Sequence, residues 1–211
     1  NDLAKQLRER RFAEGAINFE RYEVEFNLDE KGKPLGVFFK ESKEANHLIE
    51  ELMLLANRTV AEAIGKVPRD KKARAFVYRI HDVPDPEKLD IFNSFILRFG
   101  HKIKTSGSKA EVARSLNSVL DKVQGRPEEN LIETIAIRTM SKAIYSTKNV
   151  GHYGLAFDYY THFTSPIRRY PDMMVHRLLE RYLDGAKSVD QNSLEAESKH
   201  CSDMEQIAAN A

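Results

Sequence analysis

The chain contains 211 residues, of which 41% are hydrophobic and 31% are charged, a composition typical of a globular domain rather than of a disordered segment. Its 33 basic and 32 acidic side chains leave a net charge of +1, so charge alone indicates no nucleic-acid partner, and its single cysteine excludes an internal disulfide or a thiolate-rich zinc site. No apolar run reaches the roughly 18 to 20 residues of a membrane span, and the first residues are too charged for a secretory signal, so we expect a cytoplasmic protein without a membrane partner.

The first predicted elements are a helix and a β-hairpin. Residues 2–14 have helical composition, with apolar residues opposite a basic face. Polar and apolar residues alternate over 22–28, residues 29–34 contain the glycine and proline of a turn, and an apolar run returns over 35–39. This pattern predicts two antiparallel strands joined by the turn.

A long helix is predicted from an N-cap at Ser42 to a C-cap at Gly65. The stripe expected to face the core consists of Ala45, Leu48, Ile49, Leu52, Ala56 and Val60. A rotation of about 100° per residue places a second group roughly opposite this stripe, namely Glu50, Leu54, Asn57 and Ala61. An acid and an amide on a helix surface are ordinarily solvated, whereas the apolar residues beside them favour an internal or ligand-facing position. The sequence leaves both interpretations open.

The rest of the chain is predicted to be mainly helical. Its expected strands cover 76–80 and 153–157, and its expected helices cover 87–99, 110–123, 128–144, 172–183 and 194–211. Together with the hairpin, these elements predict an α+β fold that is mainly helical with a small antiparallel sheet. Because the chain starts and stops inside predicted helices, we expect it to be part of a longer protein.

Residues 161–172 have the sharpest local pattern in the chain. Ser165 before Pro166 is typical of a helix start, and Pro171 forbids a continuous helix because it cannot donate to the carbonyl of Ile167. We therefore expect one helical turn, a kink and then the helix at 172–183, with unpaired backbone N–H groups at the broken start. The side chains beside these groups are Thr164, Ser165, Arg168 and Arg169. Such a set favours an oxyanion site, and phosphate is the expected ligand.

Three features of the sequence have competing interpretations. Arginines at a helix start are commonly solvated or paired with acids, here Asp172 or Glu180. Phe19 is either an exposed platform on which a base stacks or the first residue of a half-buried strand. His81 and Asp82 superficially match a metal-binding pair, but a turn histidine followed by a helix-start aspartate is the stronger interpretation.

Five blocks of sequence occur in order along nearly the whole chain: 14–20 (EGAINFE), 48–57 (LIEELMLLAN), 79–89 (RIHDVPDPEKL), 138–145 (RTMSKAIY) and 151–172, which contains GHYGLAF and TSPIRRYPD. Together they resemble the RNB catalytic domain of the RNase II and RNase R family, with the closer likeness to bacterial RNase R. The TSPIR block is specific to that domain, and the tail with His200, Cys201, Ser202 and Glu205 is similar to its closing helix. The resemblance therefore identifies residues 1–211 as the C-terminal portion of an RNB catalytic domain.

The resemblance implies a processive 3′-to-5′ exoribonuclease that hydrolyses single-stranded RNA to nucleoside 5′-monophosphates with Mg²⁺. It implies that an aspartate cluster holds the metal and that Arg168 contacts the scissile phosphate, to which a planar, permanently charged guanidinium donates two parallel hydrogen bonds. It further implies that Phe19 stacks on bases at the 3′ end, a sequence-tolerant contact, and that Glu50 lies near the terminal nucleotides. The residues expected to bind RNA beside Arg168 are Thr164, Ser165 and Arg169.

One part of the family pattern has no counterpart in the sequence. The family's aspartate cluster belongs to a segment before residue 1, and the acids of the proline turn at 82–90 do not match it. The family's cold-shock and OB-fold domains also lie outside the chain. We therefore expect the chain alone to hydrolyse no RNA and to be prone to self-association through exposed sheet surface, and we expect a monomeric full-length enzyme. The alternative function is a non-catalytic module that binds single-stranded RNA.

Overall fold

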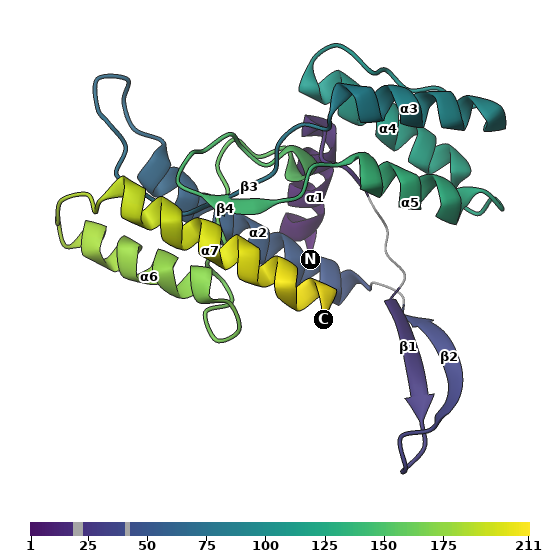
Figure 1. The fold of residues 1–211 in the computed structure, drawn as a ribbon, viewed down its shortest axis with the longest axis horizontal. Helices are drawn as coiled ribbons and strands as arrows, with labels where there is room; N and C mark the ends of the chain where they lie inside the picture. Colours follow the sequence, from purple (N-terminus) through teal and green to yellow (C-terminus); the bar gives the residue numbers. More distant parts are fainter. Residues whose placement is uncertain (19–22, 41–42) are drawn as a thin grey trace.

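The computed structural model describes residues 1–18, 23–40 and 43–211 (Figure 1). Its α-helices are α1 (Asp2–Glu14), α2 (Glu44–Gly65), α3 (Pro86–Ile96), α4 (Lys109–Val123), α5 (Glu129–Thr139), α6 (Tyr170–Leu183) and α7 (Gln191–Asn210). Its strands are β1 (Glu23–Leu28), β2 (Pro34–Lys40), β3 (Tyr78–Ile80) and β4 (Ile144–Ser146), and its 3-10 turns are η1 (Leu97–Phe99) and η2 (Tyr153–Leu155). The strands form two antiparallel pairs, β1–β2 and β3–β4, which confirms the predicted α+β, mainly helical fold. No helix within the described ranges is long and apolar enough to cross a membrane.

Helices α3, α4 and α5 pack into a three-helix unit at one end of the molecule (Figure 1). α4 begins at Ser108, whose hydroxyl accepts a hydrogen bond from the Glu111 N–H, while the Glu111 carboxylate accepts one from the Ser108 N–H at 2.9 Å. These bonds, together with Lys104, lower the pKa of Glu111 to about 2. The apolar stripe of α4 is buried in one cluster with residues of α3 and α5. The helices predicted at 87–99 and 110–123 are confirmed by α3 with η1 and by α4.

A second core lies between the β3–β4 sheet and helices α2, α6 and α7. Phe76, Val175 and Leu194 are buried in it, and they come from the segment before β3, from α6 and from α7. α7 runs beside β4 and α6 (Figure 1). Arg79 of β3 holds α7 in place, because its guanidinium donates to both carboxylate oxygens of Glu205 at 2.6 and 3.1 Å.

The β1–β2 hairpin projects from the body of the molecule (Figure 1). Phe26 lies opposite Val37 in its antiparallel register, which shifts between Asn27 and Leu28. The predicted hairpin is confirmed for the described residues, whereas Tyr22, the first residue of the predicted strand, lies outside them.

The buried face of α2 is not the predicted one. The buried residues are Glu51, Leu54, Asn57 and Ala61, whereas the predicted stripe includes the exposed Ala45, Ile49 and Leu52. The predicted core stripe is therefore wrong except at Val60, which packs against the core. Of the opposite group, Leu54, Asn57 and Ala61 are buried, whereas Glu50 is exposed. The physical reason is that the polar groups of the buried face find partners on other elements, since Arg11 of α1 forms a buried ion pair with Glu51 and Asn57 bonds to the segment before α6. A count of apolar residues along one helix cannot reveal such partners.

The ends of α2 also differ from the prediction. The observed N-cap is Lys43, and Ser42 lies outside the described residues. The helix includes Gly65 and is capped by Lys66. Gly65 is required by packing, because a Cβ there would lie 2.5 Å from the hydroxyl of Tyr78.

Three other predicted elements are shorter than expected or different. α5 ends at Thr139, five residues before the predicted end at 144, and Ile144 instead pairs with β3 as the first residue of β4. The strand predicted at 153–157 is wrong, because backbone groups within residues 152–156 bond locally and form η2. The strand predicted at 76–80 is confined to β3. Tertiary pairing decides these limits, and it is not encoded in the local pattern.

Leu54→Ala is expected to lower the free energy of unfolding by about 2–5 kcal/mol, because it leaves a cavity on the inner face of α2. Leu52→Ala, two residues away on the exposed face, is the matched control and is expected to change it by about 0.5 kcal/mol at most. Urea unfolding followed by circular dichroism measures both. A larger loss from Leu52→Ala would mean that the opposite face of α2 is buried.

Candidate functional site

The segment with the sharpest sequence pattern forms a tight turn just before α6. The carbonyl of Ser165 accepts hydrogen bonds from the N–H groups of Arg168 (3.3 Å) and Arg169 (3.1 Å), which closes one helical turn. α6 then begins at Tyr170 with Pro171 in its first turn, where the missing N–H of proline removes no helical bond. The predicted turn, break and helix are confirmed, with the helix starting at residue 170 instead of 172. Residues 163–169 are called the Arg168 turn below.

Asn57 of α2 holds the first half of the Arg168 turn. Its side-chain oxygen accepts hydrogen bonds from the N–H groups of Phe163 (2.9 Å) and Thr164 (3.2 Å). Its side-chain nitrogen donates to the hydroxyl of Tyr160 at 3.2 Å. Because Asn57 is buried, these bonds form away from water, and losing them would leave backbone groups unsatisfied.

Asp172 holds the second half of the Arg168 turn. Its carboxylate is fully buried and accepts a hydrogen bond from the N–H of Ser165 at 2.8 Å. Both carboxylate oxygens also lie 2.9 Å from nitrogens of the Arg169 guanidinium. Of the two interpretations of the arginine pair, the ion-paired one therefore holds for Arg169.

The backbone N–H groups of Thr164, Ser165, Arg168 and Arg169 are already bonded within the protein. Those of Thr164 and Ser165 bond to side chains, and those of Arg168 and Arg169 bond to the Ser165 carbonyl. The expectation that unpaired N–H groups form an oxyanion site here is therefore wrong for these residues. The Thr164 hydroxyl is buried without a hydrogen-bond partner among the described residues. Binding of an anion at this turn depends on side chains.

Of the two adjacent arginines, Arg168 is the one that is available to bind a ligand. Its side chain is exposed, and no carboxylate in the described part of the chain lies within salt-bridge distance of it. It borders a cavity of about 850 Å³ between the start of α6 and α7. The other residues around this cavity include Tyr145, Tyr170, His200, Met204 and Glu205. An available guanidinium beside an open cavity can bind a phosphate without first breaking an ion pair.

Tyr145 connects this cavity to a half-buried histidine, His162. Its hydroxyl lies 2.8 Å from Nδ1 of His162, and the guanidinium of Arg79 stacks 4.5 Å from its ring centroid. Burial raises the pKa of Tyr145 to about 12 and lowers the pKa of His162 to about 2. An uncharged imidazole with an unprotonated Nδ1 accepts the hydrogen bond of the tyrosine O–H.

Glu50 lies on α2, about two helical turns before Asn57 along the helix. Its carboxylate is 3.5 Å from a guanidinium nitrogen of Arg11 and 3.6 Å from one of Arg8, both on α1. Glu50 does not border the Arg168 cavity. The structure therefore places it in a cluster of charges between α1 and α2, and its predicted position near terminal nucleotides stays a prediction.

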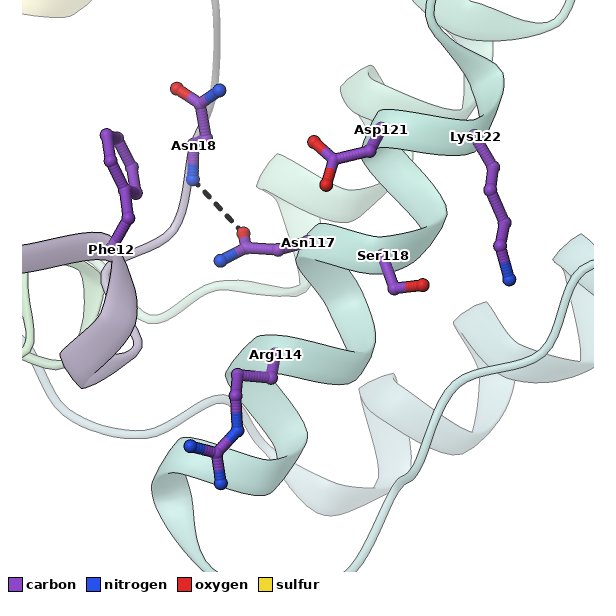
Figure 2. Close-up of a pocket in the computed structure, with 7 residues that line it drawn as sticks. All are labelled: Phe12, Asn18, Arg114, Asn117, Ser118, Asp121 and Lys122. Atoms are coloured by element: carbon purple, nitrogen blue, oxygen red, sulfur yellow. Dashed lines mark hydrogen bonds between the residues drawn. The ribbon is translucent and has the colours of Figure 1, made fainter. Parts of the chain in front are cut away.

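Phe19 lies outside the described residues, and the chain before it is held against α4. Asn117 accepts a hydrogen bond from the N–H of Asn18 at 3.1 Å (Figure 2). It also donates one to the carbonyl of Ala16 at 2.7 Å. The groove of about 600 Å³ beside them is also lined by Phe12, Arg114, Ser118, Asp121 and Lys122 (Figure 2). The stacking role of Phe19 stays a prediction.

The described residues do not provide a magnesium site. No group of three or more His, Cys, Asp or Glu side chains within them is arranged to hold a metal ion. At the His81-Asp82 pair, Nδ1 of His81 accepts a hydrogen bond from the N–H of Gly154 (3.0 Å) and the Asp82 carboxylate accepts one from Val83 (2.7 Å). Burial lowers the pKa of His81, which keeps Nδ1 available as this acceptor. The pair was expected to be a turn histidine and a helix-start aspartate, but His81 forms an isolated β-bridge with His152 and the residue that caps α3 is Asp85, so this expectation is wrong.

The sequence named Asp172 as one of two acids that could pair with the arginines, and its spacing of three residues from Arg169 is the local signal for this ion pair. Two other features of the site were missed. The contact between Tyr145 and His162 and the contribution of α7 to the cavity have no such signal, because they depend on how distant segments pack.

Comparison with known sequences relates the chain to ribonucleases. A family model described as the RNB domain matches residues 1–185. Ribonuclease R of Thermotoga maritima is 39% identical over 224 residues, which cover 100% of this chain and 30% of the relative. Ribonuclease R of Aquifex aeolicus is 37% identical over 213 residues, which cover 99% of this chain and 29% of the relative. The chain thus spans less than a third of the length of these relatives.

Solved structures give the same relationship. RNase R of Mycoplasma genitalium, in complex with ribose methylated single-stranded RNA, aligns with a TM-score of 0.78 and 28% identity over 95% of this chain and 31% of that one. Yeast Ssd1, described as a pseudonuclease, aligns with a TM-score of 0.63 and 28% identity over 76% of this chain and 20% of that one. The fold therefore occurs both in a nuclease and in a protein described as lacking that activity.

Arg169→Ala is expected to lower the free energy of unfolding by about 1–3 kcal/mol, because the buried carboxylate of Asp172 loses its cation. Arg168→Ala, the matched control, is expected to change it by about 0.5 kcal/mol at most, because the side chain is exposed. Chemical denaturation of both variants tests this difference. Equal losses would contradict the separate roles of the two arginines.

Proposed function

The chain belongs to the RNB domain family, and on this premise we propose that it forms part of a hydrolytic exoribonuclease of the RNase R type. The observation that carries the proposal is the Arg168 turn, in which Asp172 occupies one arginine and leaves the other beside an open cavity. A turn held by buried side chains and presenting one available cation is suited to binding a phosphate in a defined position.

Arg168 is the residue proposed to bind the scissile phosphate and to stabilise the negative charge that develops on it. A guanidinium donates two parallel hydrogen bonds to phosphate oxygens and keeps its charge at any physiological pH. Asn57 and Asp172 hold the backbone from which Arg168 extends. Arg169 contributes to RNA binding indirectly, because its guanidinium is bound to Asp172.

Single-stranded RNA is the proposed substrate, degraded processively from its 3′ end to nucleoside 5′-monophosphates. The family resemblance supports these details, and RNA as the ligand class is supported by the structures of Mycoplasma genitalium RNase R with ribose methylated single-stranded RNA and with double-stranded RNA. Stacking on Phe19 would contribute about 1–3 kcal/mol per base whatever the base. The residues proposed to lie near the RNA are Glu50, Thr164 and Ser165.

Magnesium is the proposed cofactor, on the family resemblance. Because the described residues lack a fitting set of ligands, those ligands are proposed to belong to an aspartate cluster outside this chain, and no step described here passes through the metal. The complete protein is proposed to be a cytoplasmic monomer.

A non-catalytic RNA-binding module is the second candidate function. The observation that favours it is the likeness to yeast Ssd1, described as a pseudonuclease, together with the lack of a metal-binding group among the described residues. An aspartate-rich block encoded directly upstream of Asn1 would favour the enzyme, and its absence would favour the module.

In the complete protein, Arg168→Ala is expected to reduce kcat by about 10² to 10³, the cost of removing one donor that stabilises a developing oxyanion. Arg168→Lys should restore little, because an ammonium cannot make the two-pronged contact. Steady-state hydrolysis of a labelled oligoadenylate measures both. An unchanged kcat in Arg168→Ala would contradict the proposal that Arg168 takes part in catalysis.

The isolated 211-residue chain is expected to release no mononucleotides from oligoadenylate in the presence of Mg²⁺, because its described residues do not assemble a metal site. The measurement compares it with a blank purified in parallel. Turnover above the blank would show that the chain carries the whole reaction.

A further inference from the structure

We propose that Asn57 is a positioning residue for Arg168, an inference that rests on the proposed function of Arg168. The side chain of Asn57 belongs to α2, is 3% exposed and does not border the Arg168 cavity. Apart from the hydrogen bond that it donates to the Tyr160 hydroxyl, the hydrogen bonds of its side chain are to the Arg168 turn, so its effect on the reaction would pass mainly through that turn.

The Arg168 turn is held by side chains on both sides. The N–H groups of three consecutive residues bond to side chains, those of Phe163 and Thr164 to Asn57 and that of Ser165 to Asp172. The next residues cannot anchor the turn, because Pro166 has no N–H and the side chain of Ile167 is fully exposed. The position of the Arg168 backbone is thus set by two buried polar residues.

Of the two residues that hold the turn, Asn57 is the one that can be removed to test the positioning of Arg168 without unfolding the protein. Asp172 also neutralises Arg169, so its loss would leave a cation unpaired. Asn57 carries no charge, and without it the Ser165 N–H and the Arg169 ion pair still hold the second half of the turn. The expected result is a folded protein in which Arg168 is displaced from the place where it meets the phosphate.

The chain offers a matched control in the three-helix unit. The side-chain oxygen of Asn93 on α3 accepts a hydrogen bond from the N–H of Ile103 at 2.9 Å, which is the same chemistry at a place remote from the Arg168 turn in the fold. Asn93→Ala should therefore reproduce any general cost of losing an asparagine that satisfies the backbone.

The test uses the complete protein and oligoadenylate. Asn57→Ala is expected to lower kcat by about 10²-fold, because small misplacements of a catalytic group have effects of this size, with little change in KM. Asn93→Ala should keep kcat. Asn57→Asp should retain more turnover than Asn57→Ala, because its carboxylate can still accept from both backbone N–H groups, but less than the unsubstituted protein, because the buried charge has no cation beside it among the described residues. The variant that combines Asn57→Ala with Arg168→Ala should lose no more than Arg168→Ala alone.

Amide hydrogen exchange gives a readout that does not depend on activity. Asn57→Ala should accelerate exchange in peptides that cover residues 160–169, whereas Asn93→Ala should accelerate it only around residue 103. If Asn57→Ala does not fold, Asn57→Ser replaces it, because its shorter side chain cannot reach both N–H groups.

The outcomes separate this inference from the proposed function. A large loss in Arg168→Ala with normal kcat in folded Asn57→Ala would overturn the role of Asn57 alone. If the fold-losses in kcat of the two single variants multiply in the double variant, Asn57 acts independently of Arg168, and its role as a positioning residue is also overturned. Normal kcat in Arg168→Ala would overturn the proposed function, and the role of Asn57 with it.

Discussion

The carboxylate of Asp172 is completely buried beside the Arg168 turn, and the local structure is arranged around it. A buried charge is stable only with a cation and hydrogen-bond donors close by. Arg169 provides the cation and the Ser165 N–H provides a donor. Since Arg169 is occupied in this way, the two adjacent arginines have different environments, and only Arg168 is available to a ligand.

The inner face of α2 follows the same principle. Glu51 is buried because Arg11 of α1 pairs with it, and Asn57 is buried because backbone N–H groups of the Arg168 turn bond to it. These contacts join α1, α2 and the start of α6, which are far apart in the sequence. An irregular turn is thereby held by regular elements, which is how a loop can carry a precisely placed functional group.

The cavity beside Arg168 depends on α7 as well as on the region that matches the family model. The match covers residues 1–185, whereas His200 and Met204 of α7 border the cavity and Glu205 binds Arg79. The fold alone does not decide activity, because a nuclease and a protein described as a pseudonuclease share it. Activity is decided by the residues of the site, and for this chain Arg168 is the residue that we propose to bind the phosphate.

The sequence by itself determined the elements whose cause is local. The hairpin follows from alternation around a turn, α4 from its capping residues and apolar stripe, and the break before α6 from Pro171. The TSPIR block also pointed to Arg168 through the family resemblance. Each of these signals lies within a few residues of the feature it predicts.

Only the tertiary structure decided which face of α2 is internal, where α5 gives way to β4 and which arginine is available. Asn57 and Thr164 are separated by 107 positions, and no periodicity within α2 indicates that its amide will meet that backbone. The energy of a buried polar group depends on the partner that packing brings to it, whereas an apolar stripe is recognised from spacing alone. For this reason the predicted stripe of α2 was wrong, and the mixed face opposite it became the support of the site.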